Sequence, residues 1–68
     1  MNYFEQTIDS KELPLGCQLT LKKKTIGRDT FFHIAIVDKS VNRVETILST
    51  QSHDEAIKKF NFVYTHTI

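Results

Sequence analysis

Apolar and polar residues alternate over the segment that begins at Cys17. Over Cys17–Ile26, Cys17, Leu19 and Leu21 fall on one side, and threonine, glutamine and lysine fall on the other. A period of two predicts a half-buried β-strand. The turn residues Gly27-Arg28-Asp29 follow, and glycine is free to adopt the positive φ that a tight hairpin needs. Residues 30–37 are then apolar on both sides, which is typical of a central strand.

A third strand is predicted for Arg43–Thr50, after a run of turn residues at 38–42. Simple alternation places Val44 and Leu48 on one side of this strand and Arg43 and Ile47 on the other. The three strands together have the spacing of a β-meander joined by short antiparallel connections.

The pattern changes to a helical one after residue 50. Ser52 and Glu55 have the spacing of a capping box, in which serine caps the first turn and glutamate stands three residues on. Apolar residues then recur at helical spacing and share one face. We expect a helix over residues 52–64, with residues 62–68 as a fourth strand if the helix ends early. The apolar face consists of Ala56, Ile57, Phe60, Val63 and Tyr64.

The first 16 residues have no clear period. Tyr3, Phe4 and Ile8 are apolar, a polar stretch follows, and Leu13-Pro14-Leu15 and Gly16 close the segment. This pattern predicts an N-terminal arm, as a short strand or a turn of helix leading into a loop. The whole chain is then a single α+β domain. It has an arm (1–16), an antiparallel three-stranded meander (17–50, four-stranded if the tail pairs), a helix (52–64) packed on one face, and a tail (65–68).

Composition narrows the class of protein. The chain has 68 residues, of which 40% are hydrophobic, and nine Lys and Arg against eight Asp and Glu give a net charge of +1. This composition is that of a folded domain rather than a disordered tail. The chain has no apolar run long enough for a membrane span and no secretory signal pattern. A single cysteine suits a reducing compartment, so we expect a cytoplasmic protein. At this size the core is small, and association with a partner or with a second copy is one source of further stability.

The residues that could carry chemistry are scattered. His33, His53 and His66 lack metal-ligand spacing, and Cys17 has no CxxC companion. Cys17 also lies on the apolar side of its strand, which indicates a small core residue. No phosphate-binding or nucleophile motif is present. We therefore expect no enzyme activity, no metal, no cofactor and no small-molecule substrate.

One helix covers only one face of a sheet, so the second face is the candidate binding surface. Basic and aromatic groups are expected to gather there, and two aromatics near the C-terminus form a second candidate patch. Two structural interpretations compete with a binding role: the lysines 22–24 form a solvated edge, or Tyr3, Phe4 and Ile8 cover this face. The predicted contact residues are Lys22, Lys24, Phe31, His33 and Arg43, with Phe62 and Tyr64 in the second patch.

Two functions fit these residues. The first is a small non-enzymatic protein-binding module that acts on a larger protein or as a homodimer. In size the chain resembles compact bacterial or bacteriophage proteins of the inhibitor or regulator kind. A basic rim around an aromatic centre favours an acidic partner surface. The second function is single-stranded nucleic-acid binding, with bases stacked on the rings and lysines along the phosphates. The small net charge counts against the second.

Overall fold

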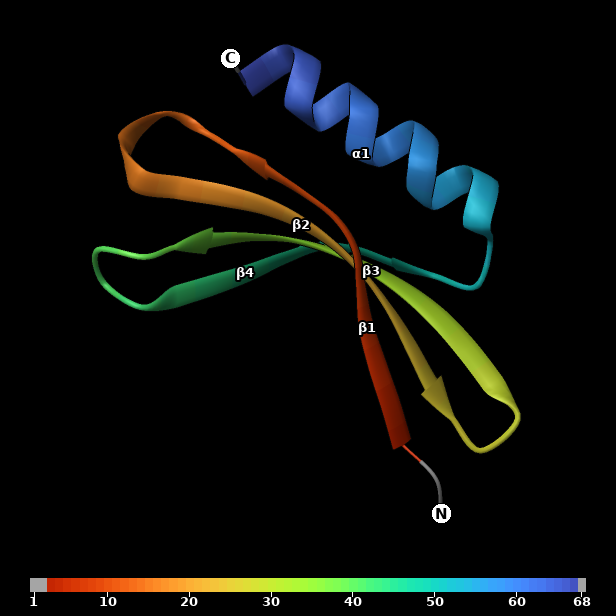
Figure 1. Ribbon diagram of the computed structural model, residues 1–68. Helices are drawn as coiled ribbons and strands as arrows, with labels where there is room; N and C mark the ends of the chain where they lie inside the picture. The colour runs from red at the N-terminus through yellow and green to blue at the C-terminus, as the bar shows by residue number, and fades with distance from the viewer. Residues whose placement is uncertain (1–2, 68) are drawn as a thin grey trace.

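The computed structural model describes residues 3–67 and has one sheet and one long helix. The four strands follow one another in the order β1-β2-β3-β4, each antiparallel to its neighbour (Figure 1). The sheet is strongly twisted, and the helix lies across one side of it. The elements are β1 (Tyr3–Glu12), η1 (Pro14–Gly16), β2 (Cys17–Ile26), β3 (Asp29–Asp38), β4 (Arg43–Thr50) and α1 (His53–Thr67). This confirms an α+β fold, with four strands rather than three.

The fourth strand comes from the N-terminus, where the sequence predicted an arm. β1 pairs with β2 along its whole length, from Tyr3 opposite Ile26 to Glu12 opposite Gln18. An irregularity between Thr7 and Asp9 places Ile8 in a bulge. Because β1 is an edge strand and changes sides at this bulge, its apolar residues show no alternation. β2 is therefore an internal strand, so the three lysines at 22–24 do not form an edge.

The helix begins where the capping pattern predicts. The Ser52 Oγ accepts a hydrogen bond from the Glu55 amide at 3.2 Å, which satisfies one of the free N–H groups of the first turn. The Ser52 amide donates to the Thr50 Oγ1 instead of to Glu55, so only half of the capping box forms. The helix continues to Thr67, three residues beyond the predicted end. Residues 62–67 are thus helical, and Ile68 of the predicted tail lies outside the described residues.

The core lies between α1 and the middle of the sheet. Phe60 and Ala56 of the helix are almost fully buried, and they pack with the fully buried Leu19, Leu21 and Ile34 of β2 and β3. Leu13, in the connection after β1, is also buried in this cluster. The β2–β3 hairpin and the start of β1 extend past the helix (Figure 1). Phe4, which projects on the helix side, is therefore 60% exposed.

β4 differs from simple alternation because it contains an extra residue. Leu48 lies opposite Ile34, but Thr46 lies opposite Ala35, so Ile47 is the extra residue of a bulge. A bulge exchanges the two sides of a strand for every residue before it. Val44 consequently lies opposite Val37, on the side away from α1. Arg43 and Ile47, predicted on that side, are not part of it: Arg43 lies opposite Asp38, and Ile47 packs against the core.

Candidate binding face

The side of the sheet away from α1, here called the open face, is not covered by any element among residues 3–67. β1 lies beside β2 in the sheet and not over it, so Tyr3, Phe4 and Ile8 do not cover this face. All three side chains remain exposed. The candidate binding surface predicted from the sequence therefore exists as an accessible surface.

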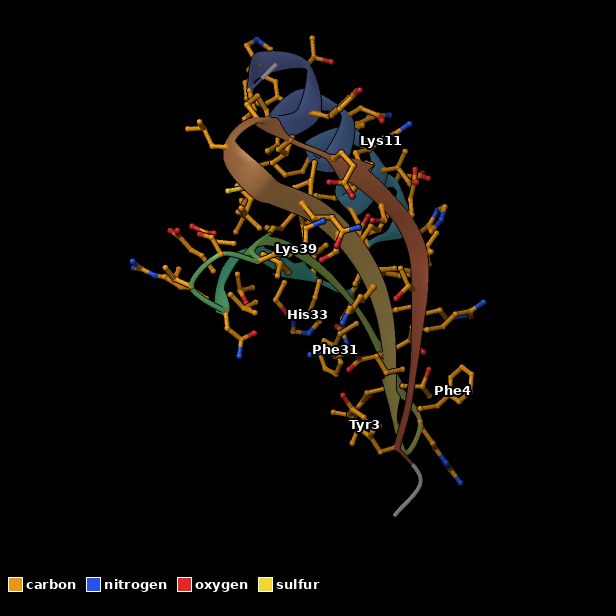
Figure 2. The ribbon with its side chains drawn as sticks, turned by 60° about the vertical axis from the view of Figure 1, so that its left-hand side comes forward. Tyr3, Phe4, Lys11, Phe31, His33 and Lys39 are labelled. Carbon is orange, nitrogen blue, oxygen red and sulfur yellow. The ribbon has the colours of Figure 1, made fainter. Side chains whose placement is uncertain are left out.

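Four of the predicted contact residues meet on two neighbouring strands of the open face. Lys22 lies directly opposite His33, and Lys24 lies directly opposite Phe31. All four are half-buried. Figure 2 shows Phe31 and His33 on the same side of the sheet as Tyr3, with Phe4 and Lys11 on the other side. The twist of the sheet and the strict two-residue alternation of β2 and β3 bring these groups together.

An acidic residue that the sequence analysis did not single out organises this cluster. The Glu5 carboxylate lies 3.1 Å from the Lys22 Nζ and 3.9 Å from the Lys24 Nζ. It also accepts a hydrogen bond of 2.7 Å from the Tyr3 hydroxyl. The hydrogen bond from Tyr3, then that from Lys22, lowers the pKa of Glu5, and the same carboxylate raises the pKa of Tyr3. One carboxylate thus offsets part of the charge of two lysines.

The sequence offered one indirect signal for Glu5. Three consecutive lysines in an internal strand have strand neighbours on both sides, and opposite charges are favoured at directly opposed positions. Glu5 lies directly opposite Lys24, but this neighbour is identifiable only once β1 is known to be a strand.

A shallow hollow lies beside the cluster, in the middle of the open face. Its volume is about 110 Å³, comparable to one large side chain. The small residues Thr20 and Ala35 are buried in its floor, and the Thr20 hydroxyl donates to the Ala35 carbonyl at 3.3 Å. The hollow has an apolar side formed by valines and a polar side formed by the lysines and histidine. It is lined by Thr20, Lys22, Lys24, His33, Ala35, Val37, Val44 and Thr46.

His33 is held in the cluster by a neighbour on each side. Its Nε2 lies 3.3 Å from the Ser49 Oγ on β4, and Lys22 stands opposite on β2. Partial burial, then the positive charge of Lys24, lowers the pKa of His33, and Glu5 opposes this shift. His33 is therefore a neutral hydrogen-bonding group at neutral pH and not a third cation.

The lowered His33 pKa predicts a dependence of stability on pH. The unfolded chain binds the histidine proton at a higher pH than the folded chain does, so folding is opposed as the pH falls from about 6.5 toward the folded-state value. We expect the urea concentration at the unfolding midpoint to decrease as the pH is lowered from about 7.5 to 5.5. The His33→Gln variant is expected to show a smaller decrease. His53→Gln, at the exposed start of α1, is the matched control. An unchanged pH slope in His33→Gln would contradict the assignment.

The other three predicted contact residues do not join the open face. Arg43 lies on the helix side of the sheet because of the β4 bulge. Phe62 is 54% exposed on the outer side of α1, where its ring stacks on His66 at 4.0 Å. Tyr64 is half-buried against the core, with the Lys11 Nζ 5.3 Å from its ring. Residues two apart on a helix point in nearly opposite directions, so Phe62 and Tyr64 do not form one patch.

The comparisons with known proteins identify no relative. The chain matches no family model, no curated protein and no solved structure. Among residues 3–67, no helix is long and apolar enough to cross a membrane. In the same part of the chain, no three His, Cys, Asp or Glu side chains gather as metal ligands would. The geometry of the open face is therefore the basis for inferring a function.

Proposed function

We propose that the chain is a small non-enzymatic binding protein that places the open face of its sheet against a larger protein. The observation that carries this proposal is the uncovered face itself. Val37 and Val44 line a hollow the size of one side chain there, and Phe31 lies directly opposite Lys24, which lines the same hollow. Aromatic groups beside such hollows are typical of the centre of protein interfaces.

The exposed area of the molecule supports a role in binding. The chain exposes 4850 Å², against about 4,400 Å² for a compact monomer of this size. The excess reflects a thin shape, with extents of 37 × 25 × 15 Å. A single sheet with a helix on one side leaves its other side to solvent or to a partner.

The charge of the open face favours a protein over a nucleic acid. Glu5 offsets part of the charge of Lys22 and Lys24, and His33 is neutral at neutral pH. A phosphate backbone would have to compete with this internal carboxylate, whereas a mildly acidic protein surface pairs with the remaining positive charge. Cytoplasmic location and the absence of catalysis remain part of the same proposal.

Capture experiments with matched variants test the proposal. Immobilised protein is expected to retain a protein partner from nuclease-treated lysate of the source cells, and Phe31→Ala is expected to weaken that retention at least tenfold. Phe62→Ala, on the outer side of α1, is the control and is expected to retain the partner normally. Equal retention by both variants and the wild type would exclude the open face as the contact.

Single-stranded nucleic-acid binding is the second candidate, because Tyr3 and Phe31 share the open face with two lysines. An amide NMR titration with oligo-dT at low salt separates the two functions. Shifts confined to Lys22, Lys24, Phe31 and His33 that vanish with added salt would favour nucleic acid. Glu5→Gln, which frees both lysines, would then strengthen binding. If oligo-dT shifts no amide signals in either the wild type or the Glu5→Gln variant, the result supports the protein-binding function.

A further inference from the structure

The two edges of the sheet differ in how they are protected against pairing with another strand. β1 carries a bulge at Ile8 and four charged residues spread along its length, which are the usual protections of an edge strand. β4 has no proline and no lysine, and its only charges are Arg43 and Glu45 at its start. No strand among residues 3–67 pairs with its outer side. The stretch from Arg43 to Thr46, before the Ile47 bulge, is thus a free and regular edge.

The charges on this edge are accessible, with Arg43 directly opposite Asp38 on β3. Among the described residues, neither Arg43 nor Glu45 makes an ion pair within 4.0 Å. Both line a hollow of about 210 Å³ on the helix side of the sheet, and no residue of α1 contributes to it. On the other side of the sheet, Val44 between them is 62% exposed. An exposed apolar side chain flanked by two accessible opposite charges therefore occupies the edge.

The sequence of this edge is complementary to itself. In an antiparallel pair with a second copy, centred on Val44, Arg43 of each copy stands opposite Glu45 of the other. A two-fold axis perpendicular to the sheet keeps each side of the sheet on the same side in both copies. The two Arg–Glu pairs then meet on the helix side, and the two Val44 side chains meet on the open side. Directly opposed residues are close enough for both contacts to form.

We propose that two copies of this chain associate through the outer edge of β4, over Arg43–Glu45, to form one continuous sheet. The occupant of the edge is a second copy, because antiparallel pairing of two such edges places each charge opposite a charge of the other sign. The edge does not include Phe31, so the proposal does not depend on the proposed function, although Val44 belongs to both surfaces. If both hold, the dimer presents two open faces side by side on one surface and binds its partner bivalently.

Sedimentation equilibrium across about 5 to 500 µM tests the association itself. A contact of about three residues per strand belongs to the small, weak class of interfaces, so we expect dissociation in the range of about 10 to 100 µM. A mass that remains monomeric throughout this range overturns the proposal. A mass that grows beyond the dimer overturns it as well, because a two-fold pair of edges is closed.

Charge exchange tests the register. Arg43→Glu gives an edge with two glutamates, and Glu45→Arg gives one with two arginines, so each variant alone is expected to dimerise at least tenfold more weakly. An equimolar mixture of the two restores both ion pairs and is expected to form a heterodimer. The double variant R43E/E45R is expected to form a homodimer again. A mixture that stays monomeric overturns this register even if the wild type dimerises.

Two controls separate these outcomes from general effects. Lys58→Glu, at an exposed position of α1, changes the net charge as much as Arg43→Glu and should leave dimerisation unchanged. Circular dichroism of each variant checks the fold, because Arg43 also lies opposite Asp38. Phe31→Ala should dimerise normally, so loss of partner binding and loss of the dimer are independent results.

Discussion

Replacing Phe60 with alanine is expected to lower the free energy of unfolding by about 3–5 kcal/mol. Phe60 is 2% exposed and is the largest of the fully buried side chains. It joins α1 to Leu19, Leu21 and Ile34 of the sheet. A domain of 68 residues has a total stability of about 3–10 kcal/mol, so we expect this variant to be largely unfolded at 37 °C. Urea unfolding followed by circular dichroism measures the change.

Phe62→Ala is the control for this experiment, because it removes the same side chain two positions along the same helix. Phe62 is 54% exposed and touches His66 and Lys59 rather than the core. Its removal should change the free energy of unfolding by no more than about 0.5 kcal/mol. Similar losses in the two variants would mean that α1 is not oriented with Phe60 toward the sheet.

The parts of the fold that were predictable from the sequence have signals within a few residues. The alternation of β2 and β3 and the Gly27 turn between them identify the central hairpin, in which Gly27 has a φ of 61°. The Ser52–Glu55 spacing identifies the start of α1. In both cases the residues that form the sequence pattern also form the structure it predicts, the β2–β3 pairing and the Ser52–Glu55 hydrogen bond.

The parts that were not predicted depend on a neighbouring strand. β1 lacks alternation because it is an edge strand with a bulge, so its identity follows from pairing with β2 rather than from its own residues. In β4, a single extra residue at Ile47 moves Val44 to the open face and Arg43 away from it. Neither bulge has a glycine or proline to mark it in the sequence.

The candidate site shows the same division between local and non-local information. Lys22, Lys24, Phe31 and His33 were placed together correctly because strict alternation and the β2–β3 turn set their register. Glu5 was missed because it reaches the cluster from β1. Its carboxylate changes the expected chemistry of the face, from a free basic rim to a partly neutralised one.

Ile34→Ala is the second variant with a large expected effect, a loss of about 3 kcal/mol in the free energy of unfolding. Ile34 is fully buried in β3, between Leu21 and Leu48 on the neighbouring strands. Ile36, two residues further on the same side, is only half-buried, and its β4 neighbour is Glu45. Ile36→Ala should therefore cost about 1–2 kcal/mol, since less apolar surface and a smaller cavity are involved.

The comparison of these two isoleucines measures where the helix cover ends. If α1 extended over Ile36, both variants would lose the same stability, and the hollow beside Arg43 and Glu45 would be closed. A clear difference between the two losses, measured by urea unfolding, means that the helix leaves this end of the sheet uncovered. The same incomplete cover that makes Ile36 tolerant of truncation thus leaves Arg43 and Glu45 accessible at the β4 edge for a second copy.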